Sequence, residues 1–209
     1  MFVTFEGLDG SGKSTQAKLL ADRLEGSGRT VVLTREPGGT PLGERIRELL
    51  LGGSDDVAPW AEAALFAAAR AELVAAVIRP ALDRGAVVVC DRYVDSSLAY
   101  QGIARGLGID EVLDLNLRAT GGLLPDRTFL LDGDPAALDA RLGRTRDRLE
   151  REGVAFRVAV ADAYRQLAAR FPERIVVLDA SHHADEIADR VANELAAASP
   201  AHGSGQGQR

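Results

Sequence analysis

Cysteine is almost absent from this sequence, which has one among 209 residues. A single thiol cannot form an internal disulfide, and such cysteine usage is typical of the reducing cytoplasm, where we expect this protein to work. The thiol, Cys90, ends an apolar run. We therefore expect it to be buried and structural.

Histidine is scarce as well. The three histidines, His182, His183 and His202, all fall late in the chain, and none is spaced with the cysteine as a metal-binding set would be. No Ser-His-Asp grouping indicates a hydrolase. We expect these histidines to lie on the surface.

No apolar run is long enough to span a bilayer, so we expect no membrane association. The formal net charge is −6, which does not favour a nucleic-acid polymer as a ligand for the whole surface. A small anionic ligand remains compatible with this charge, because a phosphate responds to local arginines and amides. Residues 199–209 are rich in Gly, Ser and Gln, and we expect a disordered tail there.

Short apolar runs alternate with segments of helical periodicity over residues 1–198. This alternation predicts one α/β domain with a doubly wound, five-stranded parallel sheet, because parallel neighbours need crossover helices. The uniformly apolar run at 86–90 is typical of a strand covered on both faces. We expect strands at 2–6, 30–34, 86–90, 128–131 and 174–178, and helices at 13–26, 41–51, 59–82, 95–103, 110–120, 135–142, 154–169 and 184–198.

The strongest functional motif is the stretch GLDGSGKS at residues 7–14. It matches G-x-x-x-x-G-K-[ST] at every fixed position and lies between a predicted strand and a predicted helix. Glycines let backbone amides turn around a phosphate, and the helix N-terminus adds its positive dipole. Lys13 can reach the β- and γ-phosphates, and the Ser14 hydroxyl can bind Mg²⁺. We predict that ATP is held by Gly7, Leu8, Asp9, Gly10, Ser11, Gly12, Lys13 and Ser14.

This P-loop alone does not identify a kinase, because regulatory GTPases and ATPase motors share it. A second signal follows the apolar strand at 86–90, where Asp91 and Arg92 stand next to each other. The carboxyl ends of strands face the ligand crevice in open α/β sheets. Asp91 is therefore placed to hold the shell of a magnesium ion, and Arg92 to grip a phosphate with two hydrogen bonds.

Four blocks, in this order, resemble the signature segments of bacterial thymidylate kinases. They are REPGG at 35–39, LFAAAR at 65–70, VCDRYVDSSLAYQ at 89–101 and DRLE at 147–150. The resemblance covers the chain except its tail. It implies the P-loop kinase fold and transfer of the γ-phosphoryl group of ATP to dTMP with Mg²⁺, giving dTDP and ADP. It also implies a homodimer.

The resemblance further implies roles on the acceptor side. Phe66 would stack on the thymine ring, and Arg70 would donate to its O4 carbonyl. Tyr100 would crowd the sugar 2′ position and so favour deoxyribose. The other implied acceptor contacts are Asp9 to the 3′-hydroxyl and to the metal shell, Ser97 to base N3, Gln101 in the same segment, and Arg92 on the phosphate with help from Arg35 and Glu36. A cis peptide before Pro37 is implied as well.

An arginine-rich segment at 141–152 is expected to form a small mobile lid over ATP. The P-loop has no arginine between Gly7 and Gly12, so the cation for the moving phosphoryl group would come from this lid. Arg146 is the first candidate for this catalytic role and Arg144 the second. Arg148 is predicted to serve either ATP binding or lid closure.

Two alternatives stay open on the sequence alone. A related P-loop kinase for another nucleoside monophosphate or a deoxynucleoside would keep the P-loop, Asp91 and the lid but change the pocket around Phe66. A nucleotide-binding switch or ATPase would hydrolyse ATP without an acceptor. The switch leaves the acceptor-side blocks unexplained.

Overall fold

A five-stranded, all-parallel sheet forms the centre of the protein. A computed structural model describes residues 1–52, 56–143 and 147–198. The strands are β1 (Phe2–Gly7), β2 (Val31–Arg35), β3 (Val87–Asp91), β4 (Arg127–Asp132) and β5 (Ile175–Asp179), in the order β2-β3-β1-β4-β5. The predicted fold class is thus confirmed. The predicted tail at 199–209 lies outside the described residues.

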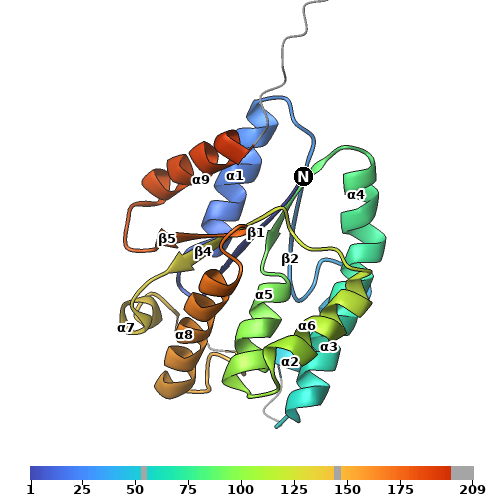
Figure 1. Ribbon diagram of the computed structural model, residues 1–209, viewed down its shortest axis with the longest axis vertical. Helices are drawn as coiled ribbons and strands as arrows, with labels where there is room; N and C mark the ends of the chain where they lie inside the picture. Colours follow the sequence, from blue (N-terminus) through green and yellow to red (C-terminus); the bar gives the residue numbers. More distant parts are fainter. Residues whose placement is uncertain (53–55, 144–146, 199–209) are drawn as a thin grey trace, which may run out of the picture.

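The sheet is buried on both faces at its centre. Val87, Val88, Val89 and Cys90 of β3 have no measurable exposure, as their uniformly apolar run predicted. Helices cover both faces. Figure 1 shows α1 (Lys13–Gly26) and α9 (Ala184–Ala198) together on one side, where α1 contacts β1, β2, β3 and α9. On the other side, α5 (Val94–Ser97) contacts β1 and α8 (Val154–Arg170) contacts β4 and β5.

The remaining helices follow one another along the chain between the strands. They are α2 (Pro41–Leu51), α3 (Pro59–Leu73), α4 (Arg79–Asp83), α6 (Ile109–Thr120) and α7 (Pro135–Asp139). Proline is the first residue of α2, α3 and α7, where a missing amide costs nothing. No helix of the described part has the length and the apolar composition that crossing a membrane requires.

Two helices contain wide, π-helical turns that the sequence periodicity did not predict. The helix expected at 59–82 is interrupted by a π-helical stretch, Val74–Ile78, between α3 and α4. Pro80 follows this stretch, and its ring and missing amide disturb the regular hydrogen-bond ladder behind it. A second stretch, Leu98–Ala104, continues α5. Such turns are frequent at functional sites, and this one carries Tyr100 and Gln101.

Strand register brings the functional segments to one edge of the sheet. Asp91, the last residue of β3, is level with Phe5 of β1 and with Arg35, the last residue of β2. The P-loop follows β1 at the same edge. Segments separated by more than 80 residues in the sequence therefore meet at the carboxyl ends of the strands.

Candidate active site

The P-loop turns so tightly that two of its glycines are required by the backbone. Gly7 and Gly10 have φ values of 135° and 84°, in the region that disfavours side chains. A Cβ at Gly7 would collide with the carbonyl oxygen of Leu131, and one at Gly10 with that of Leu138. The loop therefore lies directly against the end of β4 and against α7.

Lys13 is buried at the start of α1. Its Nζ donates to the Leu8 carbonyl at 2.8 Å and lies 3.6 Å from the Asp9 carboxylate. Burial lowers the pKa of Lys13 to about 8, and the charge of Arg92 acts in the same direction, while Asp9 and Asp91 oppose it. A bound polyphosphate would favour the charged ammonium, because an opposite charge nearby stabilises the ionised form.

Ser14 and Asp91 contact each other across the edge of the sheet. The Ser14 hydroxyl donates to Asp91 Oδ2. The other oxygen, Oδ1, is buried and has no hydrogen-bond partner within the part of the chain that the structure describes. A hydroxyl and a carboxylate beside a phosphate cradle are the oxygen donors that Mg²⁺ takes from P-loop proteins, so the donor set fits this ion.

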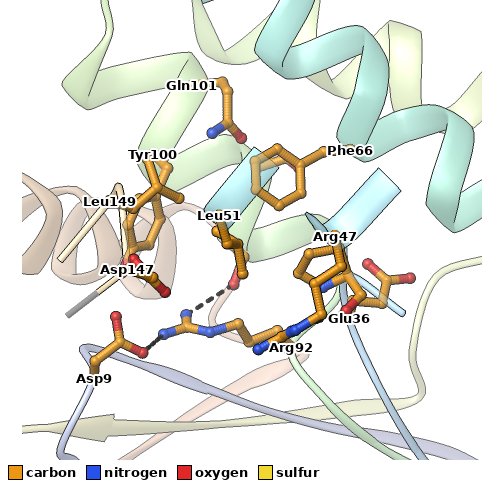
Figure 2. A pocket seen from close by; sticks show the side chains of 13 residues that line it. Asp9, Glu36, Arg47, Leu51, Phe66, Arg92, Tyr100, Gln101, Asp147 and Leu149 are labelled. Carbon is orange, nitrogen blue, oxygen red and sulfur yellow. Dashed lines mark hydrogen bonds and ion pairs between the residues drawn. The ribbon is translucent and has the colours of Figure 1, made fainter. Parts of the chain in front are cut away.

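Arg92 has a left-handed backbone and a firmly held side chain. Its φ is 72°, which makes it the one described non-glycine residue with positive φ. One amino group donates to Asp9 (Figure 2), and the other to Ser96 Oγ at 3.1 Å and Tyr164 OH at 3.2 Å. Burial alone would raise the pKa of Asp9, but the charges of Arg92 and Lys13 hold it well below its usual range.

A buried carboxylate beneath Arg92 was not predicted from the sequence. Glu6, with no measurable exposure, accepts from the Tyr93 amide at 2.7 Å, Ser96 Oγ at 2.6 Å and Tyr164 OH at 2.9 Å. Burial raises the pKa of Glu6, and the nearby Asp95 adds to this effect. Glu6 thus orients the two hydroxyls that contact Arg92. It precedes the P-loop motif, and the apolar run around it suggested only a strand.

Arg70 is fully buried and organises one wall of the site. Its guanidinium donates to Glu36 at 2.7 Å, to Ser97 Oγ at 3.0 Å and to the Tyr93 carbonyl at 3.0 Å, and it also contacts Asn116. Burial raises the pKa of Glu36 to about 7, although Arg70 opposes the shift. The Glu36–Pro37 peptide bond is cis, as the family resemblance implied.

A cavity opens between α2, α3 and the Leu98–Ala104 stretch. Figure 2 shows the rings of Phe66 and Tyr100 on two sides of it, with Gln101 at one end and Arg92 at the other. Ser97 also lines it, whereas Arg70 supports this wall from behind. The structure therefore brings most of the predicted acceptor residues together, but Arg70 and Arg35 do not line this cavity. Lining residues to which the sequence analysis assigned no role include Arg47, Leu51, Ser96, and Asp147 and Leu149 of the DRLE block.

A second cavity lies over the P-loop. It is lined by Gly10, Gly12, Lys13, Ser14 and Asp91 from the predicted phosphate and metal sites, together with Arg141. The two cavities adjoin, because one group of four residues lines both of them. These residues are Asp9, Glu36, Arg47 and Arg92.

Four predicted arginines remain, and the structure describes two of them. Arg35 lines the P-loop cavity, is more than half exposed and lies 3.3 Å from Glu44. Arg148 is buried against Glu62 and donates to the Leu50 carbonyl at 2.8 Å, which favours the lid-closure role over ATP binding. Arg144 and Arg146 lie outside the described residues.

A parallel sheet with a P-loop, a magnesium-compatible Ser–Asp pair and a second, adjoining cavity defines a P-loop kinase. The second cavity favours this class over a nucleotide-binding switch, because phosphoryl transfer needs an acceptor site beside the triphosphate.

Comparisons with known proteins identify the family. A family model described as thymidylate kinase matches residues 5–191. The thymidylate kinase of Leifsonia xyli subsp. xyli (strain CTCB07) is 57% identical over 194 residues, which cover 91% of this chain and 92% of that protein. That of Bifidobacterium longum (strain DJO10A) is 54% identical over 191 residues, covering 90% and 93%. A crystal structure of thymidylate kinase from Ehrlichia chaffeensis superposes with a TM-score of 0.77 at 35% identity, covering 94% of this chain and 98% of that one.

The chain belongs to the thymidylate kinase family. The activity of this family is the phosphorylation of dTMP with ATP. The sequence-based predictions of the family, the fold and the enzyme class are therefore confirmed. Neither a different acceptor nor a switch that transfers nothing is supported.

Proposed function

We propose that ATP binds over the P-loop, that dTMP binds in the cavity between Phe66 and Tyr100, and that their phosphates meet where the cavities join. One observation carries this assignment: Asp9, Glu36, Arg47 and Arg92 line both cavities. Two arginines at such a junction neutralise the charge of two anions brought end to end.

The acceptor cavity is suited to a pyrimidine deoxynucleotide. The Phe66 ring offers a stacking surface, and Ser97 and Gln101 offer polar groups to the edge of a base. The Tyr100 ring packs beside Arg92, whose guanidinium carbon lies 5.6 Å from the ring centroid. The base would thus lie near Phe66 and Gln101, and the phosphate near Arg92 and Asp9. Tyr100 would then face the sugar.

Magnesium would be held by Ser14 and Asp91, with the phosphates completing the shell. The bound ion would neutralise the charge on the β- and γ-phosphates during transfer. The protein contributes the Ser14 hydroxyl and the Asp91 carboxylate, whose Oδ1 atom is buried.

Arg141 belongs to the arginine-rich segment and is among the residues that the structure describes. It lines the P-loop cavity near Lys13 and Ser14, and its Nη1 donates to the Ala180 carbonyl at 3.2 Å. This contact supports a place beside the nucleotide. Arg146, with Arg144 second, stays the proposed source of the cation that meets the γ-phosphate.

We also propose a homodimer. Leu42 and Leu49 of α2 and Trp60 of α3 are large apolar side chains that are about half exposed or more on neighbouring helices. Obligate homodimers bury such apolar surface at their interface. Analytical ultracentrifugation of the purified chain measures the oligomeric state directly, and a monomer at micromolar concentration would contradict the proposal.

Calorimetric titration with dTMP tests the acceptor site. The titration is made with Mg²⁺ and a non-hydrolysable ATP analogue present, and dUMP, dCMP and AMP are compared. Phe66→Ala is expected to weaken dTMP binding roughly 5- to 150-fold, the range for loss of one base–aromatic stack. Phe171→Ala is the control, because Phe171 packs at the C-terminus of α8 beside Arg170 and Arg174. Unchanged dTMP affinity in Phe66→Ala would refute this site.

A further inference from the structure

A buried carboxylate on α3 lies next to the acceptor cavity but does not line it. Glu62 has no measurable side-chain exposure. It accepts from Gln101 Nε2 at 2.8 Å and from Arg105 Nη2 at 3.3 Å, and it contacts Arg148 Nη2. A carboxylate is buried only at a high cost unless it is paired and hydrogen-bonded, so this cluster of donors is built around Glu62.

Arg148 docks residues 147–152 onto the C-terminus of α2. Besides its contact with Glu62, its Nε donates to the Leu50 carbonyl at 2.8 Å, and its backbone amide donates to the Leu51 carbonyl at 3.2 Å. The last carbonyls of a helix have no partner within the helix and carry its negative dipole end, so a guanidinium there is doubly favoured. Arg105 adds a second link, because it contacts Glu152 as well as Glu62.

The docked segment forms part of the acceptor cavity. Asp147 and Leu149, on either side of Arg148, both line it. The position of Arg148 therefore determines the position of this wall of the cavity. On the opposite side of the cluster, Glu62 fixes Gln101, since a carboxylate only accepts hydrogen bonds and so demands the NH₂ end of the amide.

We propose that Glu62 is a positioning residue that makes the Gln101 contact and the docked wall of the acceptor cavity form together. The same carboxylate binds both, so an acceptor that contacts Gln101 and Leu149 stabilises the docked segment. By reciprocity, docking strengthens acceptor binding. The inference rests on the acceptor site proposed above.

Hydrogen exchange of the full-length protein tests this coupling. The readout is the exchange rate of the peptide that contains residues 147–152, with and without dTMP in the presence of Mg²⁺ and a non-hydrolysable ATP analogue. Wild type, Glu62→Gln, Arg148→Gln and the double variant are compared. Glu72→Gln, the same change on the same helix but outside the cluster, is the control. Steady-state KM for dTMP and for ATP is measured on each.

In wild type and Glu72→Gln, dTMP is expected to slow exchange in this peptide. In Glu62→Gln the slowing should be lost, and KM for dTMP should rise roughly tenfold with KM for ATP little changed, as for loss of a charge-assisted hydrogen bond. The KM for dTMP of the double variant should be no higher than that of the more impaired single variant. Arg148→Gln supplies the same readout if Glu62→Gln fails to fold.

Retained dTMP-dependent slowing in both single variants, or additive effects in the double variant, would overturn the proposal. The absence of slowing in wild type would overturn it too. Phe66→Ala separates this failure from failure of the acceptor site. If Phe66→Ala loses dTMP binding while Glu62→Gln behaves as wild type, the acceptor site is supported and only the proposed coupling through Glu62 is refuted.

Discussion

Arg92 and Asp9 join the end of β3 to the P-loop through a guanidinium–carboxylate contact of 2.5 Å. Arg92 keeps a φ of 72° to make it, in a region that costs an L-residue about 1–2 kcal/mol. Such strain persists where surrounding contacts over-determine the conformation, and Ser96 and Tyr164 supply them on the other amino group. Arg92, one of the two arginines that line both cavities, is therefore preorganised.

Tyr164→Phe tests this preorganisation. The change removes one hydroxyl that contacts Arg92, Ser96 and Glu6 and keeps the ring in the core. We expect KM for dTMP to rise roughly 5- to 10-fold, the effect of about 1 kcal/mol, with KM for ATP nearly unchanged. Initial-rate kinetics with each substrate varied measures both.

A matched control is Tyr93→Phe. It also deletes a buried hydroxyl, but one that donates to the Leu123 carbonyl at 3.1 Å, away from Arg92. If Tyr164→Phe changes the KM for dTMP and the KM for ATP by the same amounts as Tyr93→Phe does, then Tyr164 serves packing only.

Arg70 and Glu36 give a prediction for stability. Arg70→Gln leaves Glu36 buried without its cation, together with the other groups that Arg70 contacts. Breaking a buried ion pair from one side costs about 3–5 kcal/mol, so the free energy of unfolding should fall by that order. Urea denaturation, monitored by circular dichroism, measures this free energy. The exposed pair of Arg118 and Asp114 offers the control Arg118→Gln, which should unfold as wild type does.

If Arg70→Gln is as stable as wild type, the cluster does not support the wall of the acceptor cavity.

Local signals explain why much of the site was predictable. The glycines of the P-loop predict its tight turn. Asp91 and Arg92 come at the end of an apolar run, and the carboxyl end of such a strand faces the ligand crevice. The order of strands and helices predicts the parallel sheet in the same way. Each of these inferences uses residues adjacent in sequence.

The rest of the site depends on approaches between distant elements. Tyr164 stands 72 residues after Arg92 on α8, and Arg47 lies on α2, so neither belongs to a motif that the sequence analysis could single out. Arg148 illustrates the limit: its motif suggested a role in ATP binding or in lid closure, and only the position of Glu62 favours one. Side-chain partners across 86 residues leave no periodic trace in the sequence.

Glu36 gives a prediction for pH dependence. Burial raises its pKa from 4.5 to about 7, although Arg70 opposes the shift, and Oε1 has no hydrogen-bond partner among the described residues. Between pH 4.5 and 7 the folded state therefore binds more protons than the unfolded state, so its stability falls as pH rises. This contribution is complete below pH 4.5 and is lost as pH rises through about 7.

Glu36→Gln removes this titration and keeps the shape of the side chain. We expect the variant to gain stability relative to wild type by on the order of 1 kcal/mol or more as pH rises from 4.5 to 7. Urea unfolding at half-unit intervals of pH measures the difference. Glu44→Gln is the contrasting variant. The backbone amide of Gly39 and the charge of Arg35 lower the pKa of Glu44 against a smaller opposing effect of burial, so its contribution is present above the unfolded-state pKa and is lost as pH falls. If the two variants change with pH in the same direction, the burial of Glu36 does not control its proton.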